Sequence, residues 1–257
     1  MIYISSLSGG RDSTAMTVRL LEIGAPLDHI VFCDTGYELP EMHDYIDRLN
    51  SWLKWKFGRE ITIVKPTATI EEWAFGRIAD NPRFKRPNQV RGLPMRIGMD
   101  YCTRELKIKP ISNYAKQFGE YALYIGYVAR ENRQASGDAN EYLYPLKEWG
   151  WNEPEVDEYL KAKCIYNELY ENFSRTGCWL CPKQSKSSWF QIWKNYPDKW
   201  EYAKSLENQL EGQEAINPTF RDGYQKLEVL EREFIAQLKK PQFDFDWNDE
   251  QVSCFCK

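Results

Sequence analysis

The chain has 257 residues, 42% of them hydrophobic, which is enough to bury a substantial core in one domain of moderate size with a smaller appendage. Its formal net charge of −4 excludes a global electrostatic attraction for nucleic acid, although a local basic face stays open. No segment approaches the ~18 consecutive apolar residues of a membrane span, and no basic region with a signal core precedes the first apolar run. We therefore expect a soluble, cytoplasmic protein with no membrane partner.

The first predicted elements are a strand at residues 1–4 and a helix at residues 13–22, joined by a short loop. Glycines in the loop let the backbone turn tightly and bring its N–H groups close to an anion, and the helix N-terminus adds partial positive charge. Asp12 is placed to cap the helix or to orient Mg²⁺. We predict a phosphate-binding loop, against the alternative of an ordinary capped turn, at Ser8-Gly9-Gly10-Arg11-Asp12-Ser13.

Strands and helices alternate along the first half of the chain. Strands are predicted at residues 29–33, 61–64 and 121–128, and a helix at residues 40–57. This alternation predicts a parallel α/β sheet with right-handed crossovers. Ligands of such sheets bind at the carboxyl ends of the strands, so the 8–13 loop, Asp34-Thr35-Gly36 and the loop after Val128 should meet there.

From Trp149 onwards the pattern favours helices, including a packing helix at residues 224–238, and predicts no strand. We therefore place an α/β domain at residues 1–146 and a helical module at residues 147–257. Tryptophans interleaved with lysines in this module fit either its own small core or a surface that stacks unpaired bases. They are Trp179, Trp189, Trp193 and Trp200.

Seven cysteines without a secretory signal argue against a disulfide framework. Cys178 and Cys181 form a CxxC pair whose spacing suits a zinc knuckle, an iron–sulfur site or a redox dithiol. Both histidines, His29 and His43, lie in the first domain, so a mixed Cys/His zinc site is not expected. Cys33 lies inside an apolar strand and is predicted to be part of the core.

Besides the 8–13 loop, four further segments carry a broader pattern in a fixed order: Cys33-Asp34-Thr35-Gly36-Tyr37-Glu38-Leu39-Pro40-Glu41, Tyr101-Cys102-Thr103-Arg104-Glu105-Leu106-Lys107-Ile108-Lys109-Pro110, Gly126-Tyr127-Val128-Ala129-Arg130-Glu131-Asn132-Arg133 and Tyr144-Pro145-Leu146-Lys147-Glu148-Trp149. Together the five segments resemble the signatures of the phosphoadenosine-phosphosulfate (PAPS) reductase family of PP-loop (N-type) ATP pyrophosphatases, over residues 6 to about 182. Their shared order makes the resemblance far more specific than any single segment.

The resemblance implies an adenine-nucleotide α-hydrolase-like (PP-loop) fold followed by a smaller, mainly helical cysteine/metal module. It implies that the 8–13 loop holds the phosphates of ATP, PAPS or adenosine 5′-phosphosulfate (APS) with Mg²⁺, and that Asp34-Thr35-Gly36 and Gly126 contribute to the nucleotide site. Asp12 is a catalytic candidate. Basic side chains that could neutralise phosphate or sulfate, or instead be surface charges or ion pairs, are Arg104, Lys107, Arg130 and Arg133.

The resemblance extends to the metal. In the iron–sulfur adenylylsulfate reductases a tandem Cys-Cys joins a distant CxxC to hold a [4Fe–4S] cluster; here Cys102 matches the first cysteine and Thr103 replaces the second. The implied cluster ligands are thus Cys102, Cys178 and Cys181, with a fourth from Cys164, from the tail cysteines, or absent. A four-thiolate Zn²⁺ site fits the same spacing.

The C-terminal cysteines bear on whether the chain reduces a sulfated nucleotide. Assimilatory reductases of this family carry a cysteine in Glu-Cys-Gly-Leu-His that attacks the nucleotide's sulfur; this chain has Cys254 and Cys256 without Gly-Leu-His. Attack by Cys256 therefore stays open beside metal ligation and a frayed terminus.

The resemblance implies an enzyme of adenine-nucleotide-dependent sulfur chemistry. One branch cleaves ATP to AMP and pyrophosphate and transfers sulfur to a base, a nucleic acid or a small molecule; the other reduces PAPS or APS with a thiol electron donor. The alternative is a nucleotide-sensing module with a structural zinc and no turnover. The acceptor, the donor and the oligomeric state, including a homo-oligomer, stay open.

Overall fold

The computed structural model describes residues 1–78, 88–95, 101–221 and 225–239. Its strands are β1 (Ile2–Leu7), β2 (His29–Cys33), β3 (Ile61–Val64), β4 (Val90–Gly92), β5 (Tyr121–Tyr124), β6 (Glu141–Leu143) and β7 (Ala215–Asn217). Its helices are α1 (Arg11–Glu22), α2 (Pro40–Phe57), α3 (Ile70–Ala74), α4 (Tyr101–Thr103), the π-helix η1 (Arg104–Ile108), α5 (Lys109–Lys116), α6 (Pro145–Glu148), α7 (Glu153–Ala162), the 3₁₀-helix η2 (Glu168–Glu171), α8 (Lys186–Asn195), α9 (Pro197–Leu210) and α10 (Leu227–Leu238).

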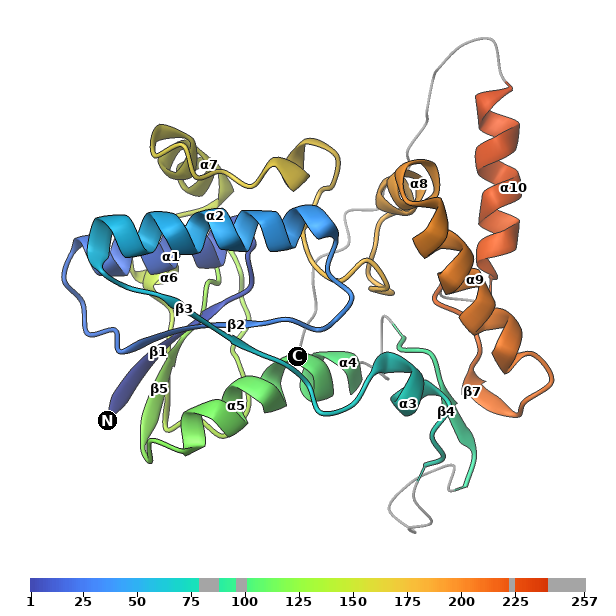
Figure 1. Cartoon of the computed structure of the whole chain (residues 1–257), viewed down its shortest axis with the longest axis horizontal. Helices are drawn as coiled ribbons and strands as arrows, with labels where there is room; N and C mark the ends of the chain where they lie inside the picture. Colours follow the sequence, from blue (N-terminus) through green and yellow to red (C-terminus); the bar gives the residue numbers. More distant parts are fainter. Residues whose placement is uncertain (79–87, 96–100, 222–224, 240–257) are drawn as a thin grey trace.

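A five-stranded parallel sheet in the order β3-β2-β1-β5-β6 forms the centre of the first half of the chain. Helices α1, α2 and α7 lie on one side of it and α5 on the other (Figure 1). Strands buried on both faces read as near-continuous apolar runs, as in His29–Cys33 of β2. The predicted parallel α/β sheet is therefore confirmed.

Helix α2 shows why the local predictions succeeded. Proline at its first position starts it without losing a hydrogen bond, and Gly58, with φ 65°, ends it in the left-handed conformation. Its buried residues recur at helical spacing: Met42, Tyr45, Ile46, Leu49 and Leu53. The predicted ranges 29–33, 40–57 and 61–64 match β2, α2 and β3, whereas the strand predicted at residues 121–128 ends at residue 124.

Helix α7 follows the predicted domain boundary and packs on α1. Glu22 of α1 accepts hydrogen bonds from Tyr159 at 2.6 Å and from Lys163 at 2.5 Å, and Arg11 pairs with Asp157 at 3.1 Å. These contacts join the segment after residue 146 to the first turn and the last turn of α1. The division into residues 1–146 and 147–257 stays a prediction.

Helices α8, α9 and α10 gather beyond the carboxyl ends of the central strands (Figure 1). Trp189 and Trp200 are each 1% exposed and pack against Phe234 or Phe220, so the interpretation of these two tryptophans as core is confirmed and the base-stacking one is wrong for them. None of the helices in the described residues combines the length and apolar character that a bilayer crossing requires.

The expectation that no strand follows Trp149 is wrong. Strand β7 pairs in parallel with β4 to form a second, two-stranded sheet. Gly92 of β4 has φ 80° and passes so close to Asn217 that a Cβ atom at residue 92 would overlap its backbone. A three-residue strand shows no measurable alternation, and its partner lies more than a hundred residues earlier, so the local pattern could not indicate it.

Candidate functional site

Three loops follow neighbouring strands at the carboxyl edge of the central sheet, where the parallel α/β pattern predicts that they meet. Strand β1 lies between β2 and β5, and all run in parallel, so the loops that follow them emerge side by side. The β5 loop touches the start of α1 closely: a Cβ atom at Gly126 would lie 2.8 Å from both the backbone N and the Cα of Ser13. Glycine at residue 126 is therefore required by this approach.

The 8–13 loop keeps its shape through its own serines. Ser13 Oγ accepts from the Ser8 N–H at 3.0 Å and donates to the Gly10 carbonyl at 3.1 Å. Gly9 has φ 73°, and Gly10 precedes α1 with no side-chain cap. The first N–H groups of α1 lack intrahelical partners by geometry, so the loop presents donors and a partial positive charge to an anion.

Asp12 points a buried, unpartnered oxygen into this site. Its Oδ1 accepts no hydrogen bond from the described residues, and the nearest cation, the Arg11 Nε, is 3.8 Å away. The pKa of Asp12 is raised to about 7, mainly by burial; Arg11 lowers this pKa, and the carboxylates of Glu153 and Glu131 raise it. A carboxylate oxygen without a partner, among other acidic groups, suits a divalent cation.

Residues 167–176, which the sequence analysis did not single out, contact the 8–13 loop. Asn167 Nδ2 donates to the Gly9 carbonyl at 3.0 Å. The Tyr170 hydroxyl accepts from the Arg11 N–H at 3.1 Å and from Thr176 Oγ1 at 3.3 Å. The one sequence feature that could have drawn attention to this segment is that Thr176 directly precedes Gly177 and Cys178 of the CxxC motif.

The loop after β2 is held by its own polar residues. Asp34 Oδ1 accepts from the Gly36 N–H at 2.9 Å, and Thr35 Oγ1 donates to Glu38 at 2.9 Å. Asp34 and Thr35 therefore shape the turn, and Gly36, with φ 83°, is left exposed at its tip. Glu38 is only 7% exposed, and its Oε2 has no hydrogen-bond partner among the described residues.

Lys107 is close enough to three cysteines for their charges to act on it. It is part of the π-helix η1, an irregularity that is common at functional sites. Burial lowers the pKa of Lys107, but nearby negative charge outweighs burial and leaves this pKa above its ordinary value. The groups responsible, in decreasing order, are Glu38, Cys178, Cys181 and Cys102.

The CxxC loop, residues 178–181, is joined to the loop after β2 by a main-chain hydrogen bond. In it the Trp179 N–H donates to the Tyr37 carbonyl at 2.8 Å. Burial raises the pKa of the Cys178 thiol well above its ordinary value, and Glu38 adds to this while Lys107 opposes it. Thus Cys102, from the η1 region, and the CxxC pair influence the same lysine from sequence positions more than 70 residues apart.

The predicted metal ligands are only partly assembled. No three His, Cys, Asp or Glu side chains in the described part of the chain are arranged as a metal-ligand group. The three thiols near Lys107 have the donor chemistry of a sulfur-ligated metal, so the residues fit such a group in kind while their sulfurs would have to move closer. Cys164 is exposed beyond the end of α7, and Cys254 and Cys256 lie outside the described residues.

Two other predictions on single residues can be compared with the structure. Cys33 is 7% exposed and donates to the Leu106 carbonyl at 3.0 Å, so its interpretation as core is confirmed. Burial raises its thiol pKa to about 12. Arg104 is exposed and pairs with Glu105.

The arginines after β5 are engaged in ion pairs beside the site. Arg130 is exposed and pairs with Glu153, whereas Arg133 pairs with Glu131 at 2.7 Å and lies 3.9 Å above the Tyr127 ring. Both follow β5 at the carboxyl edge of the sheet, and binding of phosphate by either would require these pairs to rearrange.

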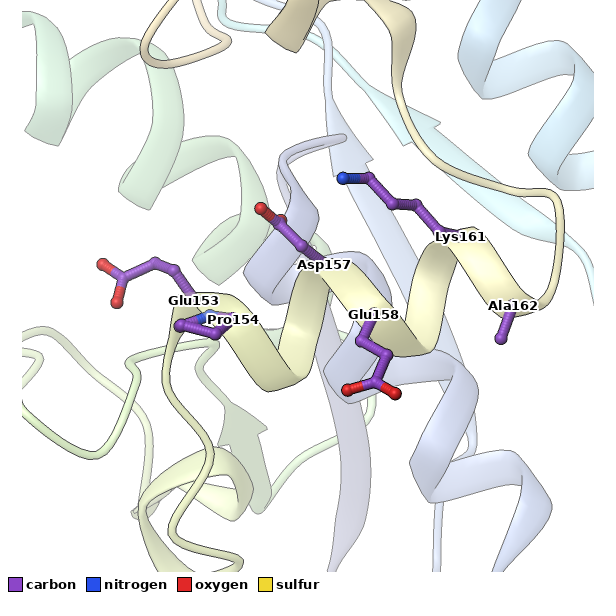
Figure 2. A pocket seen from close by; sticks show the side chains of 6 residues that line it. All are labelled: Glu153, Pro154, Asp157, Glu158, Lys161 and Ala162. Atoms are coloured by element: carbon purple, nitrogen blue, oxygen red, sulfur yellow. The ribbon is translucent and has the colours of Figure 1, made fainter.

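A shallow hollow of about 700 Å³ runs along α7, and its lining is mostly charged. Figure 2 shows Asp157 and Lys161 pointing to one side of the helix and Glu158 to the other. Asp157 is paired with Arg11, so the hollow borders the 8–13 loop. No residue of this loop lines the hollow.

The sequence model of the phosphoadenosine phosphosulfate reductase domain matches residues 2–184. The chain belongs to this family. The five-segment resemblance is thereby confirmed, and the match covers the sheet, the 8–13 loop and the CxxC pair of this PAPS reductase family member.

Individual relatives are distant. The adenosine 5′-phosphosulfate reductase of Deinococcus radiodurans is 28% identical over 188 residues, covering 66% of this chain and 63% of that protein. An uncharacterized protein of Methanocaldococcus jannaschii is 24% identical over 212 residues, covering 76% of this chain and 46% of its own length, so the chain spans less than half of that relative. The crystal structure of the PAPS reductase of Candida auris in a phosphate complex aligns with a TM-score of 0.47 at 18% identity, covering 69% of this chain and 81% of that one.

Proposed function

We propose that the chain is an enzyme of adenine-nucleotide-dependent sulfur chemistry. The nucleotide phosphates bind at the 8–13 loop, and sulfur is handled beside Lys107 by Cys102, Cys178 and Cys181. The observation that carries the proposal is the hydrogen bond from Trp179 to the Tyr37 carbonyl, because it holds the CxxC loop against the β2 loop at the edge where the phosphate cradle lies. A nucleotide-sensing module has no need for a lysine such as Lys107 close to the three thiols.

The acidic surroundings of Asp12 favour ATP with Mg²⁺ as the nucleotide. A phosphate chain alone would meet repulsion from the Asp12 carboxylate, whereas Glu131 and Glu153, which also raise the Asp12 pKa, are paired with Arg133 and Arg130. A divalent cation between the Asp12 carboxylate and the phosphates removes that repulsion and satisfies the orphaned Asp12 Oδ1. We therefore favour the branch in which ATP is cleaved to AMP and pyrophosphate.

In that branch the steps balance as follows. A carbonyl oxygen of the acceptor attacks the α-phosphorus of ATP, the bond to the β-phosphate oxygen breaks, and pyrophosphate leaves with the bonding electrons. A sulfide from a sulfur donor then attacks the activated carbon and forms a C–S bond; the C–O bond to the phosphate breaks, AMP departs with the bonding electrons, and loss of the remaining sulfur-bound proton leaves the thiocarbonyl product. The N–H groups of the 8–13 loop stabilise the charge that develops on the phosphates, and the Lys107 ammonium stabilises the anionic sulfur.

The cysteine group would hold a metal in either branch. A [4Fe–4S] cluster on Cys102, Cys178 and Cys181 would keep one iron open to hold inorganic sulfide, and we favour it over Zn²⁺. In the alternative arrangement the open position would be filled by a fourth ligand from Cys164, Cys254 or Cys256. The protein's own part is to bury the thiols and to place the positive charge of Lys107 beside them.

Reduction of a sulfated nucleotide is the second candidate, and the 28% identical APS reductase of Deinococcus radiodurans favours it. In that reaction two electrons from a thiol donor reduce the transferred sulfur to sulfite, the donor is oxidised to a disulfide, and the nucleotide leaves without its sulfate. Cys256 would be the attacking thiol. Both candidates use the same phosphate cradle.

The two candidates predict different products. With ATP, Mg²⁺, a sulfur donor and candidate acceptors, we expect pyrophosphate release that requires both Mg²⁺ and Asp12. Because kcat/KM follows groups of the free enzyme and Asp12 must be charged to hold the cation, kcat/KM should rise between about pH 6 and pH 8. The variant Asp12→Asn should lose this rise, while Asp44→Asn, on the exposed side of α2, should keep it.

Sulfite release from PAPS or APS without pyrophosphate release from ATP would replace the first candidate with the second. Absence of both products, with ATP still bound, would favour the nucleotide-sensing module.

The metal is tested on protein purified without oxygen. We expect a broad visible charge-transfer absorbance and bound iron, both lost in Cys102→Ser, Cys178→Ser and Cys181→Ser. Absorbance retained in Cys164→Ser would leave the fourth position to the tail or open, and its loss would make Cys164 the fourth ligand. Colourless protein with stoichiometric zinc would reject the iron–sulfur cluster.

A further inference from the structure

The Tyr170 hydroxyl lies directly over the phosphate cradle. A Cβ atom added at Gly10 would lie 3.1 Å from this hydroxyl, and the Arg11 N–H donates to it at 3.1 Å. The tyrosine is held in place from two sides, because the Arg11 guanidinium lies 5.0 Å above its ring and Thr176 donates to its oxygen at 3.3 Å. Its position is therefore set before any ligand arrives.

The hydrogen bonds of this hydroxyl leave its proton unused. A phenol oxygen has two lone pairs and one proton. Arg11 and Thr176 occupy both lone pairs, and no hydrogen bond donated by Tyr170 joins it to the described residues. Burial raises the Tyr170 pKa above its ordinary value, so the proton stays on the oxygen near neutral pH.

Asp12 Oδ1 has no hydrogen-bond partner among the described residues and so accepts no bond from Tyr170, which leaves the Tyr170 proton available to an incoming ligand. The same spot is bordered by the N-terminus of α1 and by the Ser8 hydroxyl, which lies 3.3 Å from a Cβ atom at Gly10. A helix N-terminus attracts negative charge, and a neutral hydroxyl donor adds a hydrogen bond there without the desolvation cost of a further cation. A phosphate oxygen meets both requirements.

We propose that Tyr170 donates a hydrogen bond to the phosphate chain of the bound adenine nucleotide, and that Thr176 positions Tyr170 for this contact. The inference rests on the proposed function, since it assumes that an adenine nucleotide occupies the 8–13 loop. It adds a binding residue and a positioning residue from the 167–176 segment to a site otherwise built by the sheet.

The test is the Kd for Mg²⁺–ATP, measured by calorimetry on the full chain. Hydrogen bonds to charged groups contribute about 1.5–3 kcal/mol, so Tyr170→Phe should weaken binding at least about tenfold. Tyr45→Phe is the matched control: it removes the same atom nearby, but the Tyr45 proton already goes to the Ile165 carbonyl at 3.0 Å. Tyr45→Phe should leave the ATP affinity unchanged.

Thr176 tests the positioning step. Thr176→Val removes the donor and should weaken ATP binding in the same direction by a smaller factor, and Thr176→Ser should restore it. Wild-type affinity in both Tyr170→Phe and Thr176→Val would overturn the inference while leaving the proposed function intact. Absence of adenine-nucleotide binding in the wild-type protein would instead overturn the proposed function. A failure of Thr176→Ser to rescue would overturn the positioning role alone.

Discussion

Replacing Gly126 with alanine is expected to weaken nucleotide binding strongly while most of the fold survives. The added methyl would lie 2.8 Å from the backbone N and the Cα of Ser13, so no flexible side-chain end can move aside. Either the β5 loop or the first turn of α1 must shift. A displacement of about 1 Å in a preorganised site costs roughly 100-fold, and we expect the Kd for Mg²⁺–ATP to rise by about that factor.

Gly119→Ala is the control that distinguishes a local shift of the β5 loop or of α1 from a general loss of protein stability. Gly119 has φ 83° with open space around the added methyl, so Gly119→Ala introduces backbone strain far from the cradle. It should lower the thermal unfolding temperature without changing the ATP affinity. An unchanged Kd in Gly126→Ala would contradict the close packing of these two loops.

Lys107→Met is expected to remove the sulfur step and to leave ATP binding in place. The substitution keeps the apolar stem but deletes the Lys107 charge, which opposes the effect of Glu38 on the Cys178 thiol. Loss of one charge-stabilising group in a preorganised site costs about 10²–10³ in rate, and we expect kcat of the wild-type reaction to fall by that factor. Calorimetry with ATP on the same protein checks that the cradle is intact.

Lys109→Met is the matched control for this variant. Lys109 lies one residue beyond η1, is exposed, and pairs with the buried carboxylate of Glu105. Its loss should change kcat little, because Arg104 also pairs with Glu105 and Lys109 is not among the groups that act on the Cys178 thiol. Equal losses of kcat in the two variants would mean that Lys107 has no special role.

The sheet was predictable because its signals are local. Each of β1, β2 and β3 is an apolar run bounded by a turn or a loop, and α2 carries its start, its stop and its buried face within a single segment. Parallel order followed from the alternation with helices. The strands β4, β6 and β7 were missed because three residues carry no periodicity and their pairing is decided by tertiary contacts.

The candidate site was predictable only in the parts that a single continuous segment forms through contacts between its own residues. The 8–13 loop is stabilised by bonds between its own residues, and the sequence therefore indicated its chemistry. The approach of Tyr170 to Arg11 joins residues 159 positions apart, and the role of Glu38 depends on Lys107 from another element. Such pairs leave no trace in spacing, so a single sequence gave the parts of the site without their arrangement.

The bond between Trp179 and Tyr37 uses main-chain atoms alone. Side-chain changes at either residue leave its donor and acceptor in place, and among standard amino acids only proline at residue 179 would delete the donor. If the proposed function holds, the backbone sets how far the nucleotide lies from the thiols, and the side chains around the site can change to suit new sulfur acceptors without altering that distance.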